Sequence, residues 1–327
     1  MVAATFGERD VILLLFCRRV CAVYRLFVSL FLSACALSAQ ADVRLLTSIK
    51  PLQLIAAAVQ DGAGQPDVLL PPGASPHQYA LRPSDVRRVR EADLFYWVGP
   101  DLEGFLPRVL QGRDKPNVVL QELPGMQLRH FEAPHDEHEE EGHDEHEHDH
   151  DHRPGSLDAH LWLLPANARV IAARMAADLA AADPANTARY QANLKAFESR
   201  LDQLDARLKA RMAKVSSKPF FVFHEAFDYF EAAYGLRHTG VFSVASEVQP
   251  GARHVAAMRE RLQKAGPSCV FSEPPVRPRL ADTLTAGLQV RLAELDALGM
   301  NAPVAANGYE TLLQNLGDGL AGCLEAL

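Results

Sequence analysis

Cysteine is scarce in this sequence, and most of it lies near the N-terminus. Three of the five cysteines, Cys17, Cys21 and Cys35, precede the part of the chain with regular patterning, which keeps only Cys269 and Cys323. Neither of these two has a second cysteine nearby, which argues against a thiolate zinc site. In an oxidising compartment the pair would form one disulfide bond; the alternative is two buried thiols. A bridge that closes a loop of about 55 residues would contribute about 4 kcal/mol to stability.

A large excess of charge is also missing from most of the chain. The formal net charge is −8, and ten of the acidic residues lie within residues 135–152, so the remainder is close to neutral. This balance gives no indication of a nucleic-acid partner or an anionic membrane surface, and we expect neither. With 327 residues and 48% hydrophobic content, the chain is long enough for two domains of ordinary size.

The N-terminal apolar run, Leu26 to Leu37, is too short for a comfortable transmembrane helix. It follows three arginines and precedes Ala39-Gln40-Ala41, a small-x-small cleavage site. This order predicts an export signal over residues 1–41, whose first part we interpret as a miscalled upstream extension. Residues 32–35 also resemble a lipobox, so lipid attachment at Cys35 is the alternative to simple cleavage.

Beyond residue 42 the predicted elements alternate between strand and helix. In the first half they are strands at 43–47, 67–70, 94–98 and 117–120, and helices at 52–60, 84–91 (with Ser84 as N-cap) and 102–111. In the second half they are strands at 220–223, 239–244, 269–272 and 290–294, and helices at 226–233, 251–264, 278–287 and 309–324. This order predicts an α/β fold with mostly parallel sheets covered by helices.

One long amphipathic helix is predicted between Pro184 and Pro219. Its apolar stripe consists of Tyr190, Leu194, Phe197, Leu201, Leu204, Leu208 and Met212, at steps of three and four. A helix of about 28 residues is on the order of 40 Å long, enough to connect two lobes rigidly. We therefore expect an N-terminal α/β lobe at 42–183, a connecting helix at 184–218 and a C-terminal α/β lobe at 219–327. The alternative is a coiled-coil dimer helix, but only one such segment exists, so we expect a monomer.

Residues 135–152, the histidine tract, contain no apolar side chain and cannot fold alone. The tract consists of one glycine, ten acidic residues and seven histidines: His135, His138, His143, His146, His148, His150 and His152. Such a composition is typical of weak metal binding, since imidazole favours zinc, copper and nickel and carboxylates attract cations. The alternative is a solvated acidic loop. We expect a disordered loop over 132–155 that collects metal without imposing one geometry.

Six histidines lie outside the tract: His77, His130, His160, His224, His238 and His254. Three of them, His77, His160 and His224, stand in a loop or a strand-to-helix connection. Ligands collect at the carboxyl ends of strands in open α/β sheets, where three imidazoles would supply nitrogen ligands for zinc. For each histidine alone, a structural role is the alternative.

The segments PHQYALRPSDV, DAHLWLLP and FHEAFDYFE, with the histidine tract and the late cysteine pair, resemble the zinc-uptake solute-binding proteins of the ZnuA family of Gram-negative bacteria. The resemblance covers essentially the whole chain after the leader. It implies a periplasmic receptor with two α/β lobes that holds Zn²⁺ in the cleft between them. It also implies delivery of zinc to a membrane permease driven by a cytoplasmic ATPase, zinc ligation by the three histidines, and a Cys269–Cys323 disulfide bond.

The sequence departs from that family at one position. Several relatives carry an acidic residue immediately before the first histidine, where this chain has Pro76. The fourth ligand is expected to be Asp296, which matches an aspartate that ligates in related receptors, or else water. A helix cap or turn is the other role for this aspartate.

Capture and release of zinc, without chemistry on a substrate, is the function that these observations favour. A zinc hydrolase would need a general base near the metal, for which Glu225 is the candidate beside His224, but no HExxH pairing exists. A metal buffer or metallochaperone that acts without a transporter is the second alternative.

Overall fold

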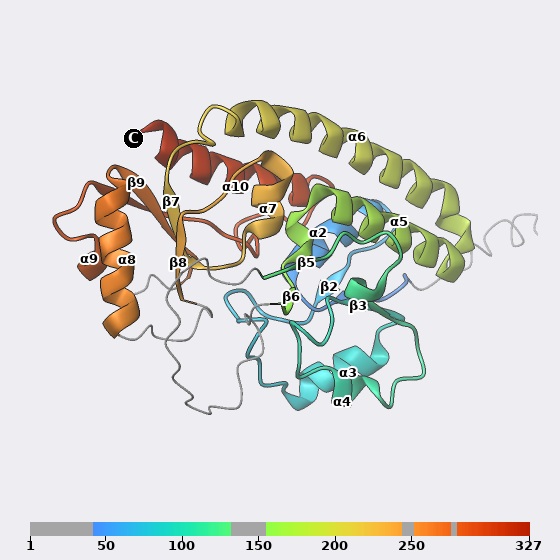
Figure 1. Cartoon of the computed structure of the whole chain (residues 1–327). Coiled ribbons are helices and arrows are strands. Elements are labelled where there is room, and N and C mark those ends of the chain that lie inside the picture. The colour runs from blue at the N-terminus through green and yellow to red at the C-terminus, as the bar shows by residue number, and fades with distance from the viewer. Residues whose placement is uncertain (1–41, 132–154, 244–251, 276–279) are drawn as a thin grey trace, which may run out of the picture. The chain divides into compact units, whose positions relative to one another are not determined.

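The computed structural model describes residues 42–131, 155–243, 252–275 and 280–327, and within this range Val43–Leu327 form a single unit (Figure 1). The leader expected over 1–41 and the histidine tract lie outside the described residues. Among the helices that are described, none has the length and apolar character needed to cross a bilayer.

A four-stranded parallel sheet organises the first half of the described chain. Its strand order is β2-β1-β3-β4, and each neighbouring pair is parallel. β1 and β3 are buried along their whole length, as is usual for parallel strands covered by helices. The strands are β1 (Leu45–Thr47), β2 (Asp67–Val68), β3 (Leu94–Trp97) and β4 (Asn117–Val119). The helices are α2 (Lys50–Val59), α3 (Pro83–Glu91), α4 (Pro107–Leu110), η1 (Leu120–Glu122), η2 (Leu161–Leu163), α5 (Pro165–Ala182) and η3 (Pro184–Asn186).

A second parallel sheet organises the other half, with the order β10-β9-β7-β8. Its strands are β7 (Phe220–His224), β8 (Gly240–Ser243), β9 (Ser268–Ser272) and β10 (Val290–Glu294). The helices are α7 (Asp228–Tyr234), α8 (Ala252–Ala265), α9 (Leu280–Thr285) and α10 (Gly308–Glu325). Two short antiparallel strands, β5 (Arg129–His130) and β6 (Leu157–Asp158), form a separate pair. Within each parallel sheet a helix separates successive strands along the chain, so the predicted α/β class with parallel sheets is confirmed.

The long helix α6 (Thr187–Met212) packs against helices of both halves. It contacts α2 and α5 of the first half and α7 and α10 of the second, as Figure 1 shows along the upper side of the chain. Six of the seven residues of the predicted apolar stripe are buried on this helix, and Leu194 is partly buried. The 3.6-residue periodicity therefore identified the buried face of α6 correctly.

Two sequence expectations about helices in the first half are wrong. The helix expected over 102–111 is only α4, because residues 99–106 form turns and Pro107, which lacks an N–H group, fits the first helical position. Ser84 is not the N-cap of α3, which begins at Pro83. The cap residue is Arg82, whose backbone N–H donates a hydrogen bond to Asp85 Oδ2 at 2.9 Å.

A disulfide bond joins Cys269 of β9 to Cys323 of α10. The Cα atoms lie 6.2 Å apart, within the usual range for a bridge. The bond ties the last helix to a strand in the centre of the second sheet, and both cysteines are buried. The disulfide bond implied by the family resemblance is confirmed, which leaves no place for the alternative of two buried thiols.

Candidate metal centre

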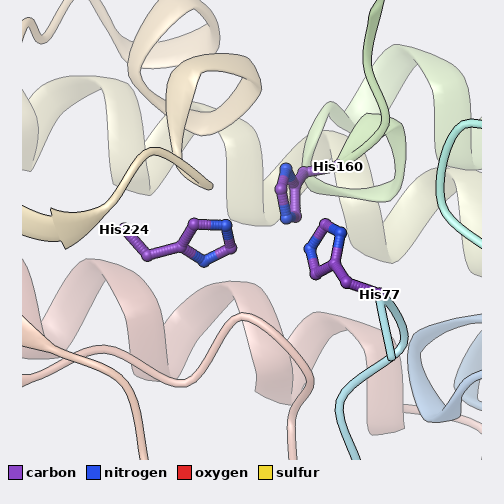
Figure 2. Close-up of side chains that lie close together, drawn as sticks. All are labelled: His77, His160 and His224. Atoms are coloured by element: carbon purple, nitrogen blue, oxygen red, sulfur yellow. The ribbon is translucent and has the colours of Figure 1, made fainter. Parts of the chain in front are cut away.

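Three histidines from three separate segments point toward one another (Figure 2). His77 lies in the irregular segment between β2 and α3, His160 stands two residues after the end of β6, and His224 is the last residue of β7. Each offers a ring nitrogen, and these nitrogens all lie within 4.8 Å of one another. In a tetrahedral zinc site with Zn–N bonds of 2.0–2.1 Å, ligand nitrogens lie roughly 3.3 Å apart. The three rings therefore need only small inward shifts to share one ion.

The ring positions confirm that the convergence is mutual. The ring centroids lie 5.4 Å apart for His77 and His160, 5.5 Å apart for His77 and His224, and 5.0 Å apart for His160 and His224. His160 and His224 are buried, with 3% and 5% of their surface exposed, whereas His77 is partly exposed. A bound ion would thus be held by two buried rings, those of His160 and His224, and by the more exposed ring of His77.

A tight turn carries the segment that contains His77. Gly73 adopts φ +78°, a conformation that favours glycine, and a Cβ atom there would lie 3.3 Å from Pro275 Cγ. The turn therefore lies against the residues that follow β9. The His77 backbone N–H donates a hydrogen bond to Ser75 Oγ at 3.3 Å. The approach of Gly73 to Pro275 places this loop of the first half beside the second sheet.

A buried carboxylate orients His160. Asp158 Oδ1 accepts hydrogen bonds from the His160 backbone N–H at 2.9 Å and from its Nδ1–H at 2.8 Å. A carboxylate only accepts, so the ring proton lies on Nδ1 and the lone pair that a metal requires lies on Nε2. The other side of the ring lies beside Trp162, at a centroid distance of 5.3 Å. The fully buried Trp162 indole donates a hydrogen bond to the Ala297 carbonyl at 2.9 Å, which fixes the indole beside the His160 ring.

A second carboxylate orients His224 through the pairing of two strands. β7 and β9 are in parallel register with Val222 opposite Phe271, so two residues further on His224 and Glu273 stand side by side. His224 Nδ1 donates a hydrogen bond to Glu273 Oε1 at 2.7 Å. A metal would therefore bind His224 through Nε2, as at His160. Carboxylate partners of this kind usually stand behind metal-ligating histidines.

The two carboxylates differ in their electrostatics. Burial raises the pKa of Asp158 to about 7. The hydrogen bond from the His160 N–H and the nearby charges of His224, Arg129 and His77 lower this pKa but do not outweigh burial. Burial would also raise the pKa of Glu273, but its attraction to His224, their hydrogen bond and the proximity of His160 and His77 outweigh that effect and lower it. Glu273 is therefore the firmly ionised partner, and its negative charge faces all three imidazoles.

The structure places Asp296 outside the group of three histidines. Asp296 follows β10, and its carboxylate accepts hydrogen bonds from the backbone N–H groups of Leu298 at 3.2 Å and Met300 at 2.5 Å. Burial raises its pKa, in opposition to these backbone hydrogen bonds. Asp296 is not among the ligand atoms that lie within 4.8 Å of one another at this centre.

Two contributors to this centre, Asp158 and Glu273, were not identified from the sequence. Asp158 stands two residues before His160, a spacing that many loop aspartates share. Glu273 lies 49 residues from His224 in the chain, so only the pairing of β7 with β9 reveals their contact. The predicted weak ligands of the histidine tract lie outside the described residues.

A second group of ligand atoms lies close by, formed by Glu225, Asp228 and His238, all within 4.8 Å of one another. His238 Nδ1 lies 3.0 Å from Glu231 Oε1 and 3.5 Å from Asp228 Oδ1. Burial lowers the pKa of His238, but the hydrogen bond and charge of Glu231, with Asp228 and Glu225, raise it to about 9. The sequence analysis did not select His238 as a ligand, because it does not follow a predicted strand.

Comparison with known proteins identifies the family of this chain. A family model described as "Zinc-uptake complex component A periplasmic" matches residues 45–323. The high-affinity zinc uptake system protein ZnuA of Yersinia pestis is 39% identical over 295 residues, covering 87% of this chain and 92% of that protein. The protein of the same name from Brucella abortus (strain 2308) is 34% identical over 301 residues, covering 85% and 90%.

Solved structures show the same fold at lower sequence identity. A crystal structure of ZnuA superposes with a TM-score of 0.70 at 22% identity, covering 86% of this chain and 99% of that one. The solute-binding protein FpvC of Pseudomonas aeruginosa, in complex with Mn²⁺, superposes with a TM-score of 0.72 at 20% identity, covering 87% and 99%. From the family match and the identity to its relatives, the chain belongs to the family of periplasmic zinc-uptake complex component A proteins.

Proposed function

We propose that this protein is an exported receptor that binds one Zn²⁺ ion tightly through His77, His160 and His224. The observation that carries the proposal is the convergence of three imidazoles from three separate segments, two of them held by carboxylates. The relatives named as high-affinity zinc uptake proteins support the choice of ion. The protein performs no chemistry on a substrate.

The donor set accounts for part of the selectivity. Three neutral imidazoles favour zinc over manganese and magnesium, which prefer oxygen ligands. Imidazoles do not discriminate against copper or nickel by intrinsic affinity. Selection against these ions must come from the geometry of the site and from the availability of each metal. For the fourth position we propose water, because the Asp296 carboxylate already accepts hydrogen bonds from the backbone of its own turn.

Substitution of His77 tests the metal centre. We expect His77→Ala to weaken zinc binding at the tight site by more than about 100-fold. Substitution of a group behind a ligand costs about 10–100-fold, and removal of the ligand itself should cost more. His254→Ala is the matched control, because His254 is an exposed histidine on α8. The measurement is a zinc titration in competition with a chelator of known affinity. An unchanged tight site in the His77 variant would show that the assignment is wrong.

We further propose that the loaded receptor acts in the periplasm and passes zinc to a membrane permease driven by a cytoplasmic ATPase. The family description and the names of the relatives support this role. The test is zinc-dependent ATPase activity of the reconstituted transporter with wild-type protein and with the His77 variant. A stand-alone metal buffer would bind zinc normally and leave the transporter unstimulated.

The histidine tract is proposed to collect zinc with low affinity near the tight site. Deleting residues 135–152 should remove several weak binding equivalents and leave one tight site, as measured by zinc titration. Loss of the tight site on deletion would reverse the two roles. The alternative, a zinc hydrolase, would need a general base at the three-histidine centre, whereas the Glu225 carboxylate groups with Asp228 and His238.

A further inference from the structure

We propose that Glu225, Asp228 and His238 form a second, weaker site for a divalent transition metal beside the three-histidine centre. The proposal does not depend on zinc binding at His77, His160 and His224, because it uses different residues. Sequence reasoning assigned none of these three side chains to a metal.

The backbone brings the three side chains together from neighbouring elements. Glu225 directly follows β7, Asp228 is the first residue of α7, and His238 lies two residues before β8. β7 and β8 pair in parallel, so the turn that enters α7 and the segment that enters β8 belong to one connection. One atom from each side chain lies within 4.8 Å of the others. Metal–ligand bonds of about 2.0–2.2 Å require only slightly closer contacts.

The position of His238 is fixed by a further carboxylate. Glu231 Oε2 accepts a hydrogen bond from the His238 backbone N–H at 2.8 Å, and both Glu231 oxygens lie within 3.1 Å of His238 Nδ1. The Glu231 side chain is only 4% exposed. A buried carboxylate that orients a histidine is the arrangement found behind most metal-ligating imidazoles. Because the pKa of His238 is raised to about 9, a metal that binds at Nε2 must displace the proton from that nitrogen.

Negative charge exceeds positive charge around this group. Glu225, Asp228 and Glu231 interact with one another and with Asp158, whereas the positive partners among the described residues are His238 and Arg129. Glu225 is partly exposed, and His238 is the positive group that interacts with its charge. A divalent cation would offset this excess of negative charge.

The chemistry of this group differs from that of the first centre. One imidazole and two carboxylates offer one nitrogen and two oxygens, a set that accepts zinc and also harder ions such as manganese. The side chains of Asp228 and His238 are 19% and 16% exposed, so solvent and ions reach them. Fewer imidazoles and greater exposure make this the weaker of the two sites.

The test is a crystal structure of the full chain with excess zinc, with anomalous data at the zinc edge. We expect one peak among the three histidines and a second between Glu225, Asp228 and His238. A filled first centre with no second peak would overturn the proposal. A missing first peak would instead contradict the proposed function, so the two failures are distinguishable.

Variants extend the test to solution. Glu225→Gln should abolish the second anomalous peak and weaken a Zn²⁺ equivalent by more than about tenfold, while the tight equivalent is unchanged. Asp114→Gln, at an exposed position, is the control, and Asp228→Asn checks a second ligand. A second peak that persists in both Glu225→Gln and Asp228→Asn would refute the ligand assignment.

Discussion

The charge of Glu273 should determine how tightly the three-histidine centre holds zinc, although Glu273 is not itself a proposed ligand. Its Oε1 lies 2.7 Å from His224 Nδ1, and its charge interacts with all three imidazoles. Glu273→Gln keeps the size of the side chain and removes that charge. The amide can also turn its NH₂ group toward Nδ1, which would favour the tautomer with the proton on Nε2, where the metal should bind.

The expected loss follows from these contacts. Changes behind a metal ligand typically cost 10–100-fold in affinity. Because Glu273 faces three rings, we expect the upper part of that range, about 30–100-fold, or about 2.0–2.7 kcal/mol. The assay is competition of the tight zinc equivalent against a chelator, with a urea unfolding curve to confirm that the variant is folded.

The control and the double-mutant cycle separate this role from a general effect of charge or folding. Glu294→Gln is the matched control, because Glu294 is exposed on β10 and pairs in register with Ser272, the neighbour of Glu273. If Glu273 acts through His224, its substitution should cost much less in a His224→Ala background. Equal costs in both backgrounds, or unchanged zinc affinity in Glu273→Gln, would refute the reasoning.

Three further predictions concern stability and the fourth ligand. Replacing Cys269 and Cys323 by alanine should lower the free energy of unfolding in urea by about 4 kcal/mol, because the bridge spans a sequence separation of 54. Addition of a reductant should not lower the free energy of unfolding of this variant further. Burial raises the pKa of Glu103 from 4.5 to about 7, so its stabilising contribution is complete below pH 4.5 and is lost as the pH rises through 7. Relative to Glu103→Gln, the wild type should lose up to about 3 kcal/mol between pH 5 and pH 8, and parallel pH curves would contradict this. Asp296→Asn should destabilise the fold but change zinc affinity by less than about tenfold, since its carboxylate serves its own turn; a larger loss in a competition titration would make Asp296 a ligand.

Local sequence patterns predicted most elements but not all their limits. The α6 stripe was identifiable because burial of one face imposes a 3.6-residue period on the sequence. The helix expected over 102–111 was too long because periodicity alone does not show where turns satisfy the backbone ahead of Pro107. The short pair β5 and β6 left no detectable pattern, since strands of two residues carry no periodicity.

The sequence by itself predicted an export leader and an imidazole-rich tract suited to metal binding, and it determined the alternating α/β order that the structure confirms. It also singled out His77, His160 and His224, because each lies in a loop or at a strand end. Tertiary structure alone decided that these three rings converge and that Glu273 stands behind His224. The physical reason is that a hydrogen bond of 2.7 Å across 49 residues depends on the register of β7 with β9, which long-range packing sets.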